Sequence, residues 1–389
     1  MCWTPSKSFC IKRKMMINPA SPYDCCGCEA CVQACPAACI SFAEDEEGFR
    51  YPKVNPDACT GCGLCERVCP MQHKGEEVRP LQVFAARSLQ EDELKKSSSG
   101  GIFAALARKV LSSGGAVCAA AFSEDFGEVR HTVIEDEAFL PGLMGSKYLQ
   151  SRIGNTFKEI KSLLEGGRDV LFCGTPCQVK ALRLFLRRDY EKLFTVDIVC
   201  HGVPSPAVWR NYLSGMGRPK AVSFRDKRSG WTDYSVTFSF ADRPELSQPY
   251  MKDDYIWLFL HDCSLRPSCF RCPAKGGRSG SDLTLGDYWG IESAHPEFYD
   301  ERGVSLVLVH SEKGMKMMEG LRVELLSSTF EAGVRENPSY LRSKQEPASR
   351  ARFFRKFKAG RPVRRIARRL RMRASIASVS SYIKRKLFV

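Results

Sequence analysis

Apolar and polar residues along residues 81–310 repeat with two periods, one typical of strands and one typical of helices. Alternating or continuous apolar runs predict strands at 81–87, 116–122, 128–134, 169–173, 194–200, 220–225, 232–240, 282–290 and 303–310. Apolar residues at helical spacing predict helices at 102–114, 155–165, 174–186 and 207–213. Strands interleaved with helices indicate an α+β or mixed α/β body and not a repeat array.

Two of the predicted strands end directly at candidate ligand-binding turns. The strand at 169–173 continues into GTPCQ (174–178), and the strand at 194–200 continues into the turn HGVPSP. Ligands in α/β proteins commonly bind beyond the carboxyl ends of the strands. A third stretch, SSSGG (97–101), precedes a predicted helix, where unpaired amides and small side chains suit a phosphate or a flavin pyrophosphate. An ordinary serine cap explains that stretch equally well.

The strongest chemical signal is a cysteine pattern that occurs twice. Residues 25–36 (CCGCEACVQACP) and 59–70 (CTGCGLCERVCP) both contain C-x2-C-x2-C-x3-C-P, and the second copy starts 34 residues after the first. In this pattern three closely spaced thiolates bind one iron–sulfur cluster, and the fourth cysteine binds the other cluster. We therefore predict two [4Fe–4S] clusters, one held by Cys25, Cys28, Cys31 and Cys69 and one held by Cys59, Cys62, Cys65 and Cys35. Cys26 and Cys39 lie outside the pattern and receive no ligand role.

Zinc and disulfides explain this pattern less well than iron–sulfur clusters do. Zinc sites usually combine two CxxC or CxxH pairs with a spacer between them, and a disulfide framework is typical of a short secreted domain. The chain has 389 residues and 19 cysteines, and its first fourteen residues lack the apolar segment of a signal peptide. We therefore expect a reducing, cytoplasmic setting in which thiols bind metal.

Charge is distributed unevenly along the chain. The formal net charge is +15, but residues 341–389 contain 17 Lys and Arg against one acidic residue. The other 340 residues carry 42 positive and 43 negative charges, so we expect no nucleic-acid-binding core. The tail also contains apolar residues, which is typical of an amphipathic helix that contacts an anionic membrane surface or an acidic partner. A basic helix packed against the body is the alternative. These apolar residues are Phe353, Phe354, Phe357, Val363, Ile366 and Leu370.

A further group of cysteines lies at 263–272, in CSLRPSCFRCP. Cys269 and Cys272 have the spacing of metal ligands, and Cys177 and Cys200 stand at the ends of predicted strands. These four residues are candidates to hold a third [4Fe–4S] cluster. Two further cysteines, Cys173 and Cys263, compete for the same four places, and free thiols remain the alternative.

An ordered series of motifs resembles a known family. The segments are SSSGGIFAALARKVL, GSKYLQS, VLFCGTPCQVKALRLFL, VDIVCHGVPSP, SFRDKRSGW, LRPSCFRCP and SDLTLGDYWGI. Over roughly residues 22–340 the chain resembles the coenzyme F420 hydrogenase/dehydrogenase beta-subunit family, in the version fused to an N-terminal dicluster ferredoxin. Bacterial proteins with this layout resemble proteins encoded beside polysaccharide-biosynthesis genes.

The resemblance implies an FAD beside an iron–sulfur cluster in the α/β body. Matched by position, the residues around the cofactor are Ser99, Gly100, Gly101, Lys147, Tyr148, Gly174, Thr175 and Gln178, and the additional cluster is held by Cys177, Cys200, Cys269 and Cys272. Lys147, Tyr148 and His201 are the candidates to protonate a reduced substrate, and each of them could instead only hold cofactor phosphates. Asp287, in LGDYWG, receives no role.

The sequence therefore predicts an iron–sulfur flavoprotein oxidoreductase. It would pass electrons between a ferredoxin or other redox partner protein, the clusters, FAD and an organic hydride acceptor such as coenzyme F420, because clusters carry single electrons and hydride acceptors take two. One alternative is an electron-transfer subunit that docks on a partner enzyme and has no substrate of its own. Another is a scaffold or sensor protein in which the clusters are structural.

The same observations divide the chain into five parts. We expect an N-terminal extension (1–20), a dicluster ferredoxin-type domain (21–76), two beta-subunit-type domains (80–162 and 163–338) and a basic helical tail (339–389).

Overall fold

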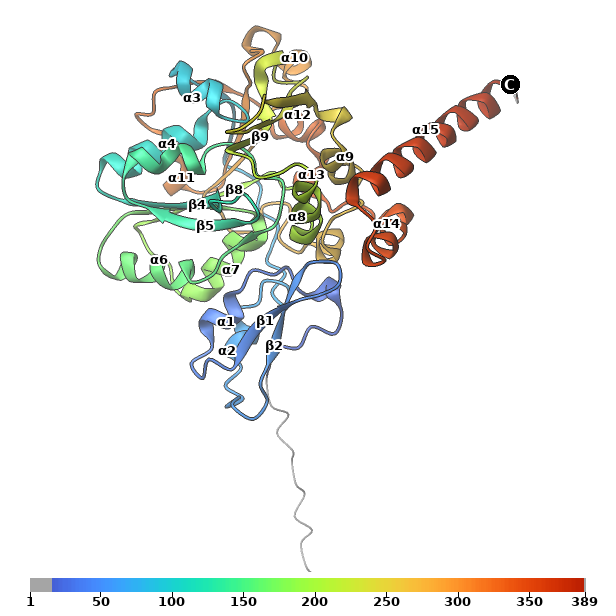
Figure 1. The fold of residues 1–389 in the computed structure, drawn as a ribbon. Coiled ribbons are helices and arrows are strands. Elements are labelled where there is room, and N and C mark those ends of the chain that lie inside the picture. Colours follow the sequence, from blue (N-terminus) through green and yellow to red (C-terminus); the bar gives the residue numbers. More distant parts are fainter. Residues whose placement is uncertain (1–15, 388–389) are drawn as a thin grey trace, which may run out of the picture.

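A nine-stranded mixed sheet runs through the body of the chain, and helices cover both of its faces (Figure 1). The computed structural model describes residues 16–387, with side chains for residues 16–375. The strand order is β14-β3-β13-β12-β8-β7-β4-β5-β6. These strands are β3 (Gln82–Ser88), β4 (Ala116–Phe122), β5 (Val129–Ile134), β6 (Ser151–Arg152), β7 (Val170–Gly174), β8 (Leu193–Ile198), β12 (Leu283–Asp287), β13 (Ser305–Val309) and β14 (Val323–Ser327). Because β4, β7, β8 and β12 run parallel, their carboxyl ends meet at one edge of the sheet.

The mixed α/β body predicted from the sequence is confirmed. The strand expected at 194–200 is shorter than predicted, because β8 ends at Ile198 and leaves Cys200 in the loop beyond it. The structure also contains a short helix, α3 (Glu91–Lys96), that the apolar pattern did not predict. Only Glu93 and Leu94 of α3 are buried, so its sequence carries no long apolar stripe.

Two groups of helices fill the faces of the main sheet. On one face, α4 (Ile102–Ser112), α5 (Leu140–Leu143) and α11 (Glu312–Met318) bury apolar side chains against the central strands. On the other face, α6 (Thr156–Glu165) and α7 (Pro176–Leu186) pack against β7 and β4. Burial of these apolar stripes stabilises the layers by roughly 25 cal/mol for each Å² of apolar surface removed from water.

A second, three-stranded sheet lies beside the first. Its order is β11-β10-β9, with β9 (Ala221–Asp226), β10 (Ser235–Ser239) and β11 (Leu246–Pro249). The strands predicted at 220–225 and 232–240 therefore belong to this sheet and not to the main one. Two helices, α8 (Pro206–Ser214) and α9 (Asp254–Leu260), complete the unit around the fully buried Trp209.

The basic tail packs onto this second unit through α14 (Ala348–Lys358) and the start of α15 (Val363–Leu387). The apolar residues that suggested a membrane-facing surface are mostly inside the protein, since Phe353, Phe354, Val363, Ile366 and Leu370 are buried in the core around Trp209. The alternative, a basic helix packed against the body, therefore describes the tail up to Leu370. Arg371 still donates to Asp253 O and pairs with Asp254, and beyond it α15 extends away from the body (Figure 1). No helix in residues 16–387 has the length and apolarity needed to cross a membrane.

The N-terminal module contains α1 (Ala30–Ala34), β1 (Ile40–Glu44), β2 (Arg50–Val54) and α2 (Leu64–Arg67) and lies against α6 and α7 (Figure 1). Cys28, Ala30 and Val68 join the apolar core formed by those helices. The carboxylate of Glu29 accepts a 2.6 Å hydrogen bond from Gly154 N of the body. Residues 1–15 of the predicted extension lie outside the described residues, but Ile17 N donates to Cys65 Sγ at 3.2 Å, so the module includes residues before 21.

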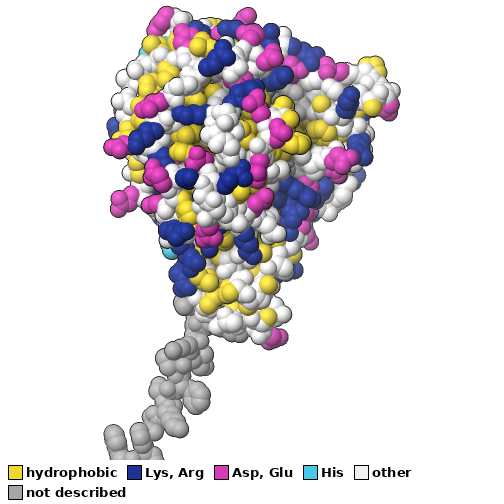
Figure 2. Space-filling model, turned by 90° about the vertical axis from the view of Figure 1, so that its left-hand side faces the viewer, with side chains coloured by type: hydrophobic (Ala, Val, Ile, Leu, Met, Phe, Trp, Pro, Cys, Tyr) yellow, Lys and Arg dark blue, Asp and Glu magenta, His cyan; other side chains and the backbone are white. Residues whose placement is uncertain are grey.

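The remaining elements are short connecting segments. Their bounds are η1 (Pro22–Asp24), η2 (Glu137–Phe139), η3 (Lys227–Ser229), η4 (Tyr250–Lys252), η5 (Pro267–Arg271), η6 (Pro296–Phe298), α10 (Ile291–Ala294), α12 (Phe330–Arg335) and α13 (Pro338–Leu341). Figure 2 shows acidic and basic side chains interspersed over one face of the molecule. This distribution agrees with the near-neutral charge of residues 1–340.

Candidate functional site

A cavity of about 540 Å³ lies at the carboxyl ends of β7, β8 and β12. Its wall brings together segments that are far apart in the sequence, namely the SSSGG loop, the GSKY segment, the GTPCQ turn and the loop after β8. Of the predicted cofactor and catalytic residues, the lining contains Ser99, Gly101, Lys147, Tyr148, Gly174, Thr175, Gln178 and His201. Its volume falls within the roughly 300–1,000 Å³ that is typical of small-molecule sites.

Gly100 does not line the cavity but fixes the loop that does. Its N–H donates to Ser305 Oγ at 2.9 Å, and a Cβ at this position would lie 2.3 Å from Ala86 O. Only glycine therefore lets the SSSGG loop pass this close to β3 and β13. Gly101 follows with a φ of +85° and caps α4, so the amino end of that helix opens at the cavity. An N-terminus of this kind favours negative charge such as phosphate.

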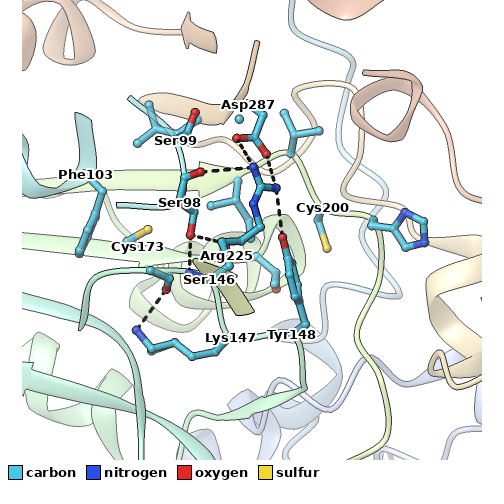
Figure 3. A pocket seen from close by; sticks show the side chains of 18 of the residues that line it. Ser98, Ser99, Phe103, Ser146, Lys147, Tyr148, Cys173, Cys200, Arg225 and Asp287 are labelled. Carbon is cyan, nitrogen blue, oxygen red and sulfur yellow. Dashed lines mark hydrogen bonds and ion pairs between the residues drawn. The ribbon is translucent and has the colours of Figure 1, made fainter. Parts of the chain in front are cut away.

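Lys147 lies in the cavity wall with its ammonium group turned toward the GSKY turn (Figure 3). Its Nζ donates to Leu143 O and Met144 O, both at 2.8 Å, and to Gly145 O at 3.2 Å. Burial lowers the pKa of Lys147 to about 7, and the nearby Cys173 thiol opposes that shift. The amine can therefore exchange a proton near neutral pH, which suits a proton donor.

Arg225 is a site residue that the sequence reasoning missed, although it lies in the SFRDKRSGW motif. Its guanidinium forms two bonds with Asp287, at 3.0 and 3.2 Å, and a third with Ser98 O at 3.3 Å (Figure 3). It also approaches Tyr148 Oη at 3.5 Å and lies 4.2 Å from the ring centre of Tyr234. These contacts give Asp287 a role. From the end of β12 it holds the Arg225 guanidinium in the cavity wall, next to the SSSGG segment.

Tyr148 and His201 both pack against the ring of Phe259. Their rings both stand 4.8 Å from the ring of Phe259. His201 Nε2 is paired with Asp262 Oδ1 at 2.6 Å, so this nitrogen is already occupied. The two candidates therefore sit in the same wall, and only Tyr148 keeps its polar atom close to the Arg225 guanidinium.

Thr175 and Gln178 have local roles in addition to lining the cavity. They form a capping box at the start of α7, in which Thr175 N donates to Gln178 Oε1 at 3.0 Å. Gln178 Nε2 donates to Ser151 Oγ at 2.9 Å. Their polar atoms therefore stabilise the turn after β7, in which Gly174 and Gln178 are buried and Thr175 is half-buried.

The cavity fits the cofactor implied by the sequence. Among the described residues, two buried nitrogens of its wall have no hydrogen-bond partner, Arg225 Nε and His131 Nδ1. Burial lowers the pKa of His131 to about 4, so that imidazole is neutral. An unpaired buried polar atom is costly, and a ligand with polar groups would satisfy it. A cationic guanidinium, a helix N-terminus and a lysine are also the groups that bind a flavin pyrophosphate.

The first two cysteine sets surround separate small cavities of the N-terminal module. One cavity is lined by all four residues of the first set, Cys25, Cys28, Cys31 and Cys69, and the other by all four of the second set, Cys35, Cys59, Cys62 and Cys65. The exchange of the fourth cysteine between the two sets is thus present in the tertiary structure. Cys62 is exposed, whereas the cysteines of the first set are buried or half-buried.

The third cysteine set, Cys177, Cys200, Cys269 and Cys272, also comes together. Burial raises the pKa of Cys200 to about 12 and that of Cys272 to about 11, and in both cases Cys177 contributes to the increase. Burial also raises the pKa of Cys269, with contributions from the other three. Cys200 lines the cavity, so this set lies between the cavity and the N-terminal module.

The two competing cysteines lie elsewhere. Cys173 lines the cavity, and burial raises its pKa to about 12; Asp197 adds to that increase and Lys147 opposes it. Cys263 is in the core of the second unit and donates to Ser349 Oγ at 3.3 Å. Among the described residues, no three His, Cys, Asp or Glu side chains converge to hold a single metal ion.

Cys26, which received no role from the sequence, bridges two of these sets. Its thiol is hydrogen-bonded to those of Cys28 and Cys177. The position could not be recognised from spacing, because Cys177 is 151 residues away in the chain.

Comparisons with known proteins agree with this arrangement. Residues 24–73 match the model of the 4Fe-4S dicluster domain. Residues 167–329 match the model for the C terminus of the coenzyme F420 hydrogenase/dehydrogenase beta subunit. A chain of the F420-reducing [NiFe] hydrogenase complex from Methanosarcina barkeri, in a xenon derivative, has a TM-score of 0.46 and 18% identity, covering 64% of this chain and 83% of that chain. No curated protein matches the chain.

The fold and the matches define an iron–sulfur protein with an N-terminal 4Fe–4S dicluster domain. Its body contains the C-terminal domain of the coenzyme F420 hydrogenase/dehydrogenase beta-subunit family. The resemblance inferred from the sequence motifs is thereby confirmed, and a redox function follows from it.

Proposed function

We propose that the protein is an iron–sulfur flavoprotein oxidoreductase that binds FAD in the central cavity. The observation that carries the proposal is that Cys200 belongs both to the cavity wall and to the third cysteine set. A third [4Fe–4S] cluster at Cys177, Cys200, Cys269 and Cys272 would therefore adjoin the cofactor. When bound, FAD would supply the exchange between single electrons and a two-electron hydride.

The residues of the cavity would then have separate tasks. The SSSGG loop, the start of α4 and Arg225 would hold the pyrophosphate, and Gly100 and Gly101 would keep the loop in place. Lys147, with its pKa lowered to about 7, is the best-placed residue to hold or deliver a proton. Asp287 would position Arg225, and the aromatic rings of Tyr148 and Phe259, 4.8 Å apart, would help to exclude water.

The clusters would form a chain from the surface to the cavity. The second set includes the exposed Cys62, so a ferredoxin or another redox protein would exchange electrons there. The first set lies against α6 and α7, next to the third set. For each organic acceptor that takes up a hydride, two one-electron donors are oxidised and solvent supplies the proton. Coenzyme F420 is the acceptor to test first because the family is described by it.

The test is anaerobic purification of the full chain, followed by iron and flavin analysis and a reductive titration. The proposal expects about 12 iron atoms and about one FAD per chain, corresponding to three clusters. About 8 irons with FAD bound would remove the third cluster, and about 12 irons without flavin would remove the cavity assignment. A bound flavin that is reduced by dithionite but oxidised by no small acceptor would favour an electron-transfer subunit instead.

A further inference from the structure

Arg266 is a completely buried arginine at the junction between the N-terminal module and the body. Its relative exposure is 0%, and it immediately precedes η5, which carries Cys269. The guanidinium donates through Nε to Cys25 O at 2.7 Å, through Nη1 to Gln150 Oε1 at 3.0 Å and through Nη2 to Arg50 O at 2.9 Å. Two of these bonds, to Cys25 and Arg50, join the body to the N-terminal module, and the third, to Gln150, stays within the body.

All three acceptors are neutral, and within residues 16–375 no carboxylate forms an ion pair with Arg266. A buried charge without a counter-charge costs several kcal/mol. The contrast is Arg350, which is also buried at this junction but pairs with Glu47 and Glu346. The fold thus supplies carboxylates to one buried arginine and none to the other.

Cysteines of the first and third sets lie around Arg266, together with the ring of Tyr51, whose centre is 4.3 Å from the guanidinium carbon. The pKa of Arg266 is lowered by burial but raised overall by Cys25, Tyr51, Cys26 and Cys269. Cys25 belongs to the first cysteine set, and Cys269 belongs to the third. None of the three hydrogen bonds of the guanidinium goes to a residue of the second set.

The packing around Arg266 leaves little space between the first and third sets. A Cβ on Gly27 would lie 2.9 Å from Arg266 Nη1 and 2.5 Å from Gln150 Nε2. The thiol of Cys26, the residue before Gly27, interacts with Cys177 of the third set. The two sets therefore share one junction, and Arg266 is the buried cation within it.

We propose that Arg266 is the shared counter-cation of the first and third clusters and raises the reduction potentials of both. This inference rests on the proposed function, because it requires clusters at both cysteine sets. Four thiolates outweigh the charge of the iron–sulfide core, so a complete cluster is an anion that gains negative charge when it accepts an electron. A fixed positive charge in a low-dielectric interior stabilises that reduced form.

The contacts of Arg266 with the two sets differ. Its guanidinium bonds directly to Cys25 O of the first set at 2.7 Å. Its link to the third set runs through the main chain, because Cys269 N donates to Arg266 O at 3.0 Å. The first cluster is therefore expected to depend on the guanidinium charge more strongly than the third.

The experiment is a potentiometric titration of the anaerobic, full-length holoprotein, with reduced clusters quantified by low-temperature EPR. In Arg266→Gln, two of the three one-electron steps move to lower potential and one stays. The larger shift is at least tenfold in the reduced-to-oxidised ratio at fixed potential, which is 59 mV for a one-electron couple. Arg271→Gln is the matched control, because Arg271 is exposed on the same short helix and stacks on Tyr23. It should leave all three steps in place.

Iron and flavin counts separate the two proposals. If wild-type protein contains only about 8 irons, the third cluster of the proposed function fails, whereas about 12 irons with unshifted steps in Arg266→Gln overturn only the role of Arg266. Should Arg266→Gln fail to retain iron, Arg266→Lys decides, because it keeps the charge and loses the fork of donors. Retention of the wild-type potentials in Arg266→Lys supports the proposal, and a tenfold fall in the reduced fraction contradicts it.

Discussion

Arg225 and Asp287 form a two-bond ion pair in the wall of the central cavity, with N–O distances of 3.0 and 3.2 Å. The side chain of Arg225 is only 4% exposed and that of Asp287 is 17% exposed. The pair connects β9 of the smaller sheet to the end of β12 in the main sheet. The pair therefore closes the cavity between the two sheets. Trp231 Nε1–H donates to Asp287 Oδ1 at 2.8 Å, so the fluorescence of this tryptophan is sensitive to the pair.

We expect Asp287→Asn to destabilise the protein by about 3 kcal/mol, because loss of one partner leaves the buried Arg225 charge unpaired. The measurement is the denaturant midpoint followed by tryptophan fluorescence. Flavin occupancy should fall in the same variant. Glu245→Gln, which removes a partner of the exposed Arg228, is the control and should change stability by less than about 1 kcal/mol. Equal effects of the two substitutions would contradict the structural role of Asp287.

Cys269→Ala should lower the iron content from about 12 to about 8 atoms per chain, since one cluster loses a ligand. Cys263→Ala is the matched control, because Cys263 lies four residues before the ligand segment begins in η5 and bonds to Ser349 instead. It should retain about 12 irons. Loss of iron in both variants, measured after anaerobic reconstitution, would return Cys263 to the candidate ligands.

Lys147 makes the free energy of unfolding depend on pH in the neutral to alkaline range. Its pKa is lowered from 10.5 to about 7, so between these values the unfolded chain binds more protons than the folded one. Stability from this residue is therefore fully present above pH 10.5 and is lost as the pH falls toward 7. We expect wild-type protein to gain stability relative to Lys147→Met as the pH rises from 7 to 10. The measurement is the free energy of unfolding of both proteins by denaturant between pH 7 and 10. A difference between them that does not change with pH would show that Lys147 has an ordinary pKa.

Gly100→Ala should destabilise the protein by roughly 2 kcal/mol, because the new Cβ would lie 2.3 Å from Ala86 O and force the SSSGG loop away from the sheet. Flavin occupancy should fall with it. Gly142→Ala is the control, since a Cβ there meets nothing within 4 Å. Thermal unfolding and flavin fluorescence measure both effects, and normal flavin binding in Gly100→Ala would exclude the loop from the cofactor site.

Phe353→Ala should cost about 4 kcal/mol in the absence of any lipid, because Phe353 is 0% exposed in the core around Trp209. Met372→Ala, in the same tail but 60% exposed, should be neutral within about 0.5 kcal/mol. If the tail instead used its apolar residues on membranes, Phe353→Ala would leave stability unchanged and weaken sedimentation with anionic liposomes.

The sequence predicted much of the fold because most elements carry a local signal. The apolar runs of β4 and β7 and the stripes of α4 and α6 are written in consecutive residues, so their periods could be read directly. The position of the site could be predicted from the sequence for a related reason. Its loops follow buried strands, and parallel strands direct their carboxyl ends to one edge. Arg225 was missed because its partner Asp287 is 62 residues away, and no local pattern links them.

By itself, the sequence determined the two ferredoxin-type cysteine sets, the α/β body, the family of its C-terminal domain and the segments that line the cavity. The tertiary structure brought the proposed third set together, because Cys177, Cys200, Cys269 and Cys272 meet only when the sheet has folded. It also decided that the tail's apolar residues belong to the core and that Arg266 has thiols and no carboxylate around it. Spacing records which residues are neighbours along the chain, whereas electrostatic environment depends on which residues folding brings together.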